Sequence, residues 1–168
     1  MGAKNYLIEG ISGTGKTSVC NELLRRGHHS IHGDRELAYQ GDPITGKQRA
    51  GFSHENHIWN VDKVRALVND HSHAATFFCG GSRNWNVFLG LFDFVFILEL
   101  DSDTLSRRLT SRSENEWGGR QSEKDFILKL HASKNGLPKS GLSINAARPI
   151  EDIAEDILQR CSLSLDVR

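Results

Sequence analysis

Apolar residues gather along the chain in short blocks, and the spacing within each block predicts its secondary structure. Five blocks predict strands, and the clearest is the continuous apolar run Phe94–Leu98, which is typical of a strand covered on both faces. The weakest candidate, residues 28–32, holds three histidines. The predicted strands are residues 6–8, 28–32, 75–79, 94–98 and 142–144.

Between these strands, apolar residues recur every three or four positions, which is the spacing of helices with one buried face. The predicted helices are residues 17–26, a segment with apolar positions from 58 to 68, a segment capped by Ser82, residues 101–112, a segment with capping-box spacing at Ser122–Asp125, and a last helix opened by Pro149. Residues 35–53 are polar and rich in glycine, so we expect a loop there. Strands alternating with helices predict an α/β protein with a mostly parallel sheet.

Composition limits the function classes. A chain of 168 residues fits one domain, and its 21 basic and 21 acidic residues balance, so it lacks the basic excess that is usual in nucleic-acid-binding proteins. No apolar stretch is long enough to predict a membrane span. Cys20, Cys79 and Cys161 lie far apart without any C-x-x-C pair, which indicates buried thiols in a reducing compartment. We therefore expect a cytoplasmic protein.

The strongest chemical signal follows the first predicted strand. Residues 10–17, Gly-Ile-Ser-Gly-Thr-Gly-Lys-Thr, fit the pattern G-x-x-x-x-G-K-[ST] in full. Glycines let consecutive backbone N–H groups turn toward one centre, and the next helix adds its positive N-terminal end. Lys16 is expected to reach the β- and γ-phosphates of ATP, and the Thr17 hydroxyl to bind the bridging Mg²⁺. The residues predicted to bind ATP here are Gly10, Ser12, Gly13, Thr14, Gly15, Lys16, Thr17 and Ser18.

With this motif and this order of elements, the chain resembles the small P-loop kinases, which include adenylate, shikimate, gluconate and nucleoside kinases. The resemblance covers essentially all of residues 1–168 and implies a single domain with a three-layer P-loop NTPase fold. It implies a five-stranded parallel sheet in the order 2-3-1-4-5, with helices on both faces and an arginine-rich lid. By the same resemblance, residues 35–60 bind the acceptor and residues 107–122 form the lid.

The segment His32-Gly33-Asp34 follows the second predicted strand. Shikimate and gluconate kinases have an acidic residue at this point, near the acceptor hydroxyl. The resemblance therefore implies that Asp34 accepts or orients the hydroxyl proton, or helps to hold Mg²⁺ through water. The alternative is that Asp34 only caps the next turn or pairs with Arg35. His32 stands where shikimate kinases have the first acid of a D-x-D pattern, so the segment departs from that family.

The third predicted strand ends in Gly80 and Gly81, with Arg83 two residues later. This turn resembles the glycine-rich turn of shikimate kinases and the arginine that nucleotide kinases place after the same strand. The resemblance implies that Arg83 holds an anionic group of the acceptor; a plain turn is the alternative. Cys79 stands where many P-loop proteins have the Walker B acid.

Arginines follow the fourth predicted strand in the spacing R-L-x-x-R, at Arg108 and Arg112, with Arg120 further on. The spacing resembles the lid of nucleotide kinases and implies that Arg108 lies against the base, while Arg112 and Arg120 close over the phosphates. A lid excludes water and prevents wasteful hydrolysis. A solvated basic helix face is the alternative. Arg148, in the turn before the last helix, is the remaining candidate for the nucleotide site.

Other candidates rest on position alone. The acceptor-binding segment of related kinases coincides here with Arg35, Tyr39 and His57. The histidines of the chain lack a matching set of cysteines or acids, so we expect no metal site from them. Glu99 and Asp101 end an apolar run and so imitate a Walker B acid, which stays open as an alternative.

The leading hypothesis is an ATP-dependent kinase that phosphorylates a small molecule. Lys16, Asp34, Arg112 and Arg120 are its predicted catalytic residues, and a nucleoside or nucleotide is the favoured acceptor because of the lid spacing and Arg83. A shikimate- or gluconate-like kinase and an antibiotic kinase are alternatives. A nucleotide-gated ATPase that works with a partner protein is an alternative of another class. A GTP-dependent switch is disfavoured because no N-K-x-D motif is present.

Overall fold

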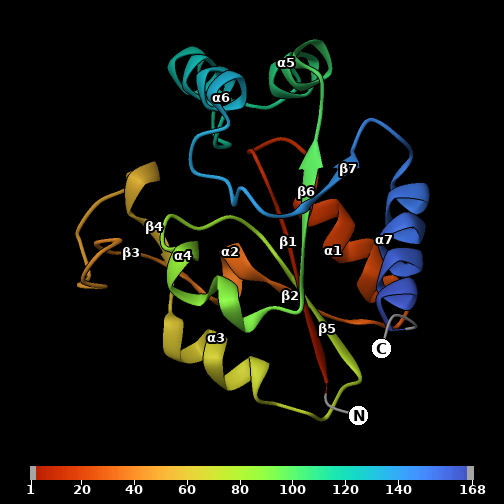
Figure 1. Ribbon diagram of the computed structural model, residues 1–168. Coiled ribbons are helices and arrows are strands. Elements are labelled where there is room, and N and C mark those ends of the chain that lie inside the picture. Colours follow the sequence, from red (N-terminus) through yellow and green to blue (C-terminus); the bar gives the residue numbers. More distant parts are fainter. Residues whose placement is uncertain (1–2, 166–168) are drawn as a thin grey trace.

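Five parallel strands form the central sheet, in the order β2-β5-β1-β6-β7. We describe it from a computed structural model, of which residues 3–165 are described here (Figure 1). Counted along the chain, the five strands have the expected order 2-3-1-4-5. The strands are β1 (Lys4–Gly10), β2 (His29–His32), β5 (Ala75–Cys79), β6 (Phe94–Glu99) and β7 (Leu142–Asn145).

Helices cover both faces of this sheet, which confirms the expected three layers. Because side chains alternate along a strand, Ile8 and Leu7 of β1 lie in different clusters of the core. Ile8 belongs to the cluster that includes buried residues of α1 (Lys16–Arg25) and α7 (Ile150–Leu165). Leu7 belongs to the cluster that includes residues of α3 (Val61–Val68) and α4 (Trp85–Phe88).

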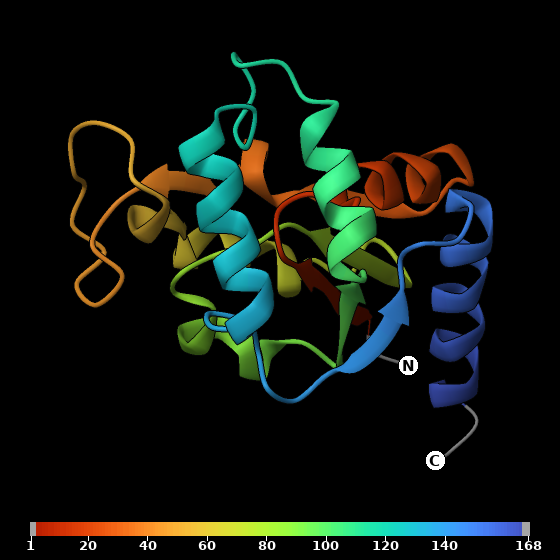
Figure 2. The ribbon, with the colours of Figure 1, turned by 90° about the horizontal axis from the view of Figure 1, so that it is seen from above.

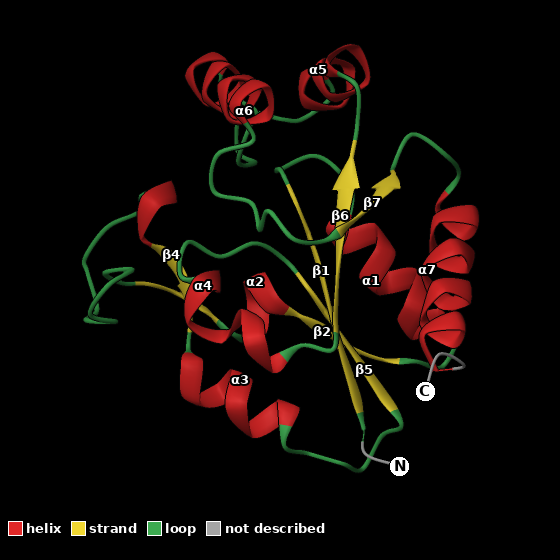
Figure 3. Ribbon diagram, viewed as in Figure 1, coloured by secondary structure: helices red, strands yellow, loops and turns green. Residues whose placement is uncertain are grey.

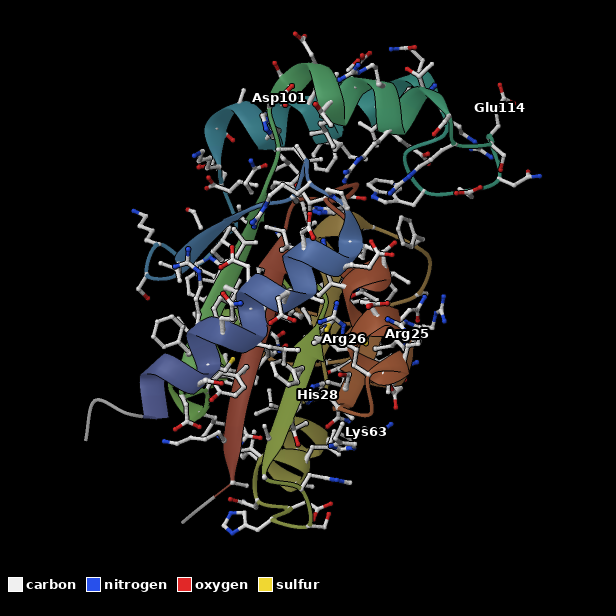
Figure 4. The ribbon with its side chains drawn as sticks, turned by 90° about the vertical axis from the view of Figure 1, so that its right-hand side faces the viewer. Arg25, Arg26, His28, Lys63, Asp101 and Glu114 are labelled. Atoms are coloured by element: carbon white, nitrogen blue, oxygen red, sulfur yellow. The ribbon has the colours of Figure 1, made fainter. Side chains whose placement is uncertain are left out.

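An arginine ties α1 to α7 at the edge of the first layer. Arg26 Nη1 lies 2.8 Å from Glu155 Oε2, and Arg26 Nη2 donates to the Glu151 carbonyl at 2.9 Å. Figure 4 shows Arg26 at the end of α1, next to α7. These contacts hold together the two helices that follow the P-loop and the last strand.

Two further helices lie over the carboxyl ends of the strands. They are α5 (Ser102–Thr110) and α6 (Gln121–Ser133), and they run side by side above the sheet in Figure 2. Leu105 and Leu109 of α5 and Ile127 of α6 are buried in the same cluster as the P-loop helix. A Cβ atom on Gly13 would lie 2.8 Å from Leu105, so α5 packs directly on the P-loop. Residues 107–122, for which the resemblance implies a lid, span the end of α5, the connection after it and the start of α6.

A second, two-stranded sheet corrects the loop that was predicted for residues 35–53 and the helix that was predicted to include Ile58. β3 (Ala38–Gln40) lies inside the expected loop, and it pairs antiparallel with β4 (His57–Trp59), apart from the main sheet (Figure 3). Ile58 therefore belongs to a strand, and α3 begins only at Val61. The Asn60 side chain marks that start, because it accepts from the Lys63 N–H at 3.0 Å. Short helices complete the fold: α2 (Gly33–Glu36), η1 (His54–Asn56) and η2 (Leu89–Leu91).

Two predicted helix caps are wrong. The residue before α4 is Asn84, not Ser82, and its amide is used elsewhere: it accepts from the Trp59 N–H and donates to the Trp59 carbonyl, both at 3.0 Å. Before α6, the Glu123 carboxylate accepts from the Gly118 and Arg120 N–H groups, so this helix begins before Ser122. The start of α4 thus follows from a tertiary contact of Asn84, and the start of α6 from a local capping box between Arg120 and Glu123.

The remaining expectations concern cysteines and membranes. Cys20, Cys79 and Cys161 are buried and none of them forms a disulfide, as expected. Within residues 3–165, no helix combines the length and the apolar character that crossing a membrane requires.

Candidate active site

The P-loop joins β1 to α1 and creates a site for anions. Gly13 and Gly15 have φ angles of 93° and 100°, a left-handed conformation that glycine adopts without strain. The first N–H groups of α1 have no carbonyl partner inside the helix, and the helix dipole adds positive potential there. Lys16 Nζ donates to the Gly10 carbonyl, so its ammonium group lies across the loop. The loop thus has the geometry that binds phosphate groups in proteins.

A pocket of about 420 Å³ lies over this loop, and we call it the P-loop pocket. Its rim is cationic: Arg108 Nη2 donates to the Ala146 carbonyl at 2.8 Å, and Arg112 Nη1 donates to Ser12 Oγ at 3.3 Å. Arg148 is held in place by Asp156 at 2.7 Å. The predicted residues that line this pocket are Ser12, Gly13, Thr14, Gly15, Lys16, Thr17, Ser18, Asp34, Arg108, Arg112 and Arg148.

A second pocket, of about 260 Å³, lies beside the first, and we call it the His57 pocket. It is lined by Gly10, Ile11, Ser12, Lys16, Asp34, Phe52, His54, His57, Gly81, Arg83, Trp117 and Leu130. The two pockets share Ser12, Lys16 and Asp34. A molecule in one pocket therefore meets a molecule in the other at the Lys16 ammonium group and the Asp34 carboxylate.

Two donors orient the Asp34 carboxylate between the pockets. His57 Nε2 lies 3.0 Å from Asp34 Oδ1, and the Gly81 N–H donates to the same oxygen at 3.3 Å. Partial burial by itself raises the pKa of Asp34, but the His57 hydrogen bond and the charge of Lys16 outweigh burial and hold the pKa below its ordinary value. Within the described part of the chain, no hydrogen bond is made to Asp34 Oδ2, so this oxygen can accept from a bound hydroxyl group.

Trp59 explains how this arrangement is built. Its buried ring stacks on Phe88, with centroids 5.5 Å apart, and its outer edge fills the space where side chains of Gly33 and Gly80 would lie. A Cβ atom on Gly33 would be only 2.1 Å from the ring. Glycine at position 33 therefore lets Trp59 pack beneath Asp34, and β4 brings both Trp59 and His57 to this place.

Aromatic side chains form the outer wall of the His57 pocket. Trp117, from the segment between α5 and α6, lies 5.4 Å from Phe52 and 6.0 Å from His54, ring centre to ring centre. His54 also meets the edge of Phe126 at 5.0 Å. Burial, helped by the charge of Arg83, lowers the pKa of His54 to about 4, so its ring is neutral at pH 7. The segment between α5 and α6 and the segment before β4 are thus joined by an uncharged aromatic contact.

Some predicted residues lie outside both pockets. Arg120 is exposed at the start of α6, and Arg35 is exposed on α2. The Tyr39 hydroxyl donates to the Gly46 carbonyl in the loop after β3. Gly80 lies behind Asp34 rather than on a pocket wall. Catalytic or binding roles for these four residues stay predictions.

The alternative Walker B acids are engaged elsewhere. Glu99 lies 3.4 Å from Lys134, and Asp101 caps α5 by accepting from the Thr104 N–H at 2.8 Å. Asp34 does not pair with Arg35 in the described structure, and its carboxylate contacts His57 instead. Among residues 3–165, no group of three or more His, Cys, Asp or Glu side chains is placed to hold a metal ion.

Sequence reasoning missed three contributors to the site. Phe52 and Trp117 come from segments without regular structure, and no pattern in the sequence predicts that they meet. Glu9 lies buried directly before the P-loop, and a signal for it was available, since it is an acid placed between the apolar run of residues 6–8 and the P-loop motif. A charge in such a position requires an explanation.

Comparison with known proteins agrees with this geometry. The sequence profile of the AAA domain family matches residues 7–129, more than two thirds of the chain. No curated protein matches the chain by sequence.

Solved structures share its fold over almost the whole chain. A gluconokinase from Sinorhizobium meliloti 1021 has a TM-score of 0.60 at 16% identity, covering 98% of each chain. A sugar kinase from Janibacter sp. HTCC2649 has a TM-score of 0.58 at 17% identity, covering 94% of this chain and 93% of its own. A shikimate kinase from Bacteroides thetaiotaomicron has a TM-score of 0.59 at 15% identity, covering 95% of this chain and 98% of its own. The chain therefore belongs to the AAA domain family, and its fold is that of the small P-loop kinases.

Proposed function

We propose that the protein is an ATP-dependent kinase that transfers the γ-phosphoryl group of ATP to a hydroxyl group of a small molecule. The observation that carries the proposal is the meeting of the two pockets at Ser12, Lys16 and Asp34. The cationic P-loop pocket suits a nucleotide triphosphate. The His57 pocket, with one oriented carboxylate and an aromatic wall, suits an acceptor.

The chemistry follows from the positions of these groups. The acceptor oxygen forms a bond to the γ-phosphorus while the bond to the β,γ-bridging oxygen breaks, and ADP leaves. The hydroxyl proton passes to Asp34 Oδ2, whose partner oxygen is held by His57 and Gly81. Lys16 and Arg112 lie where negative charge spreads over the transferred group, so they stabilise it electrostatically.

Mg²⁺ fits this site through Thr17. The Thr17 side chain is exposed and lines the P-loop pocket, as a metal-binding hydroxyl in a P-loop requires. When bound, the ion would supply positive charge that neutralises the phosphates. Cys79 stands where a Walker B acid would end β5, so the ion would depend on Thr17, the phosphates and water more than is usual.

The class of acceptor is the finer part of the proposal. We favour a nucleoside or nucleotide weakly, because the aromatic rings of Phe52 and Trp117 offer flat surfaces to a base and Arg83 offers a cation to an anionic group. A sugar or a hydroxy acid is the competing class, because the similar folds are those of a gluconokinase, a sugar kinase and a shikimate kinase.

The test measures ADP release from Mg·ATP with a panel of nucleosides, nucleoside monophosphates, gluconate, shikimate and aminoglycosides. Support requires that one acceptor raises the rate well above the background of ATP hydrolysis. Asp34→Asn must then lose this acceptor-dependent rate, by about 10²-fold, the lower end for a general base. The variant should still bind nucleotide, because the P-loop is unchanged.

The same assay separates the kinase from the other class of function. Hydrolysis of ATP that no acceptor in the panel accelerates, and that Asp34→Asn leaves unchanged, would favour an ATPase that works with a partner protein. Such a result would remove the role that we assign to Asp34.

A further inference from the structure

Glu9 is a buried acid that the proposed reaction does not use. Glu9 is 1% exposed. It is the next-to-last residue of β1, and the three residues before it in that strand are apolar. In the sheet, Glu9 lies opposite Ile97 of β6, so the neighbouring strand on that side offers it no charge. A carboxyl group in such a position is costly unless nearby groups compensate it.

The packing around the Glu9 carboxyl is specific. Oε1 accepts from the Gly10 N–H at 2.9 Å, at the point where the P-loop begins. A Cβ atom on Gly81 would lie 2.8 Å from the same oxygen. Glycine at position 81 therefore makes room for the Glu9 carboxyl on one side, while its N–H donates to Asp34 on the other.

Three charged groups from three elements surround Glu9. They are Lys16 at the start of α1, Arg83 in the turn after β5, and Asp34 on α2. Burial raises the pKa of Glu9 to about 7, against the opposing effects of Lys16, the Gly10 N–H and Arg83. Lys16 in turn donates to the Gly10 carbonyl, one peptide unit from the N–H that Glu9 binds. The strongest compensation for Glu9 thus comes from the residue that is expected to bind phosphates.

We propose that Glu9 is a positioning residue that balances the charge of Lys16 while the P-loop pocket is empty and takes up a proton from solvent when nucleotide phosphates bind there. Phosphates bring negative charge close to Glu9 and draw the Lys16 ammonium toward themselves. The carboxylate then loses its main cation and becomes the neutral acid. The inference rests on the nucleotide site of the proposed function, but not on phosphoryl transfer.

The experiment measures proton uptake during binding, with Mg²⁺ and the β,γ-imido analogue of ATP as the probe. Calorimetric titrations at pH 7 in two buffers of different ionisation enthalpy give the number of protons taken up. A carboxyl with a pKa of about 7 is half protonated at pH 7, so the wild type can gain at most about half a proton at Glu9. We expect Glu9→Gln to lack this contribution, because the amide keeps the size and the acceptor oxygen but does not titrate.

The same titrations across pH add a second readout. Because a proton is gained on binding, wild-type affinity should weaken as pH rises from 6 to 9, by up to about tenfold for each unit by which the bound state raises the pKa of Glu9. Glu9→Gln should follow a flatter curve. The matched control is Glu99→Gln on β6, which lies outside both pockets and should behave like the wild type.

The outcomes separate this inference from the proposed function. Equal proton uptake by the wild type and Glu9→Gln overturns the inference and leaves the kinase proposal standing. A difference in uptake without any acceptor-dependent ADP release supports the inference and counts against the kinase proposal. A wild type that binds no nucleotide overturns both. If Glu9→Gln fails to fold, carboxyl carbon NMR of the wild type must show one acid that titrates near pH 7 and moves higher with the probe, and its absence overturns the inference.

Discussion

The two pockets that meet at Lys16 are built in different ways. The phosphate-binding part of the P-loop pocket comes from seven consecutive residues, 12–18, and its main donors are backbone N–H groups and one lysine. The His57 pocket takes its residues from the P-loop, the start of α1, α2, the segment before β4, β4 itself, the turn after β5, the segment between α5 and α6, and α6. The first site depends on local backbone conformation, whereas the second depends on tertiary packing.

This difference shows why one site can be found in a sequence and the other cannot. Gly13 and Gly15 adopt left-handed conformations that only a few residue types tolerate, so the residue pattern follows from the backbone. In the His57 pocket, Asp34 is placed by Trp59, which is distant along the chain and packs on Gly33. A substitution should therefore damage the two pockets by different routes.

The largest effect is expected at Lys16, because this residue lines both pockets and its loss should impair both of them. Lys16→Ala should lower kcat by about 10³-fold or more, in the range of other cations that contact a transferring phosphoryl group. The melting temperature at pH 7 and above should also fall, because the buried Glu9 carboxyl loses the cation that compensates it. ADP release with the identified acceptor measures the effect.

Lys63→Ala is the matched control for that variant. Lys63 is exposed on α3, and Figure 4 shows it far from α5 and α6. Its loss should leave kcat and stability unchanged. A Lys16→Ala enzyme with near-normal kcat would contradict the role of the P-loop in the transfer.

A pH-dependent effect of about 3 kcal/mol is expected next, at the buried acid directly before the P-loop. The pKa of Glu9 is about 7 in the folded protein, whereas the ordinary pKa of a glutamate is 4.5, and each pKa unit corresponds to about 1.4 kcal/mol. The folded pKa is raised, so the contribution of Glu9 to stability is complete below pH 4.5 and is lost as pH rises through 7. Denaturant unfolding from pH 5 to 9 should therefore show a smaller decline for Glu9→Gln than for the wild type. Parallel declines would contradict this shift.

A substitution at Gly33 should impair the His57 pocket while it leaves the P-loop pocket intact. Gly33→Ala places a Cβ atom 2.1 Å from the ring of Trp59, which must shift together with Asp34. We expect a loss of stability of about 1–3 kcal/mol and a fall in acceptor-dependent kcat, with nucleotide affinity retained. Gly90→Ala is the control, since a Cβ atom there meets nothing within 4 Å. If Gly33→Ala unfolds and turns over like the control, Trp59 does not place Asp34.

The smallest expected effect concerns the aromatic wall. Phe52→Ala removes a ring that contacts Trp117, so the KM for the acceptor should rise about tenfold, equivalent to about 1.4 kcal/mol, while the KM for ATP stays unchanged. Ile44→Ala in the same loop, where the side chain is 93% exposed, should change neither value. An equal rise in both KM values would mean that the wall is shared by both pockets.

The main sheet was predictable because its strands are short apolar runs in a helix-strand alternation. The second sheet was not, since β3 and β4 have three residues each and their sequences, Ala-Tyr-Gln and His-Ile-Trp, carry no alternation long enough to detect. Ile58 was assigned to the following helix for the same reason. Strands as short as β3 and β4 form because they pair with each other. The Asn84 amide adds hydrogen bonds to the Trp59 backbone.

For the site, the P-loop and the placement of Arg108 and Arg112 followed from motifs with fixed spacing. Asp34 followed from its position after β2. Trp117 and Phe52 could not be found, because their contact joins segments that are far apart in sequence. Glu9 could have been found, since a lone acid in an apolar strand next to a phosphate-binding loop is rarely without a role.

The separate β3–β4 sheet has a consequence for how such proteins diversify. Its ladder hydrogen bonds are made within the pair, and the connection between its strands is a mostly exposed loop. Insertions and deletions in that loop would leave the central sheet and the P-loop intact, since neither shares a backbone ladder with it. Related proteins could therefore differ in the acceptor that they bind through changes in this segment alone, while the nucleotide-binding site stays the same.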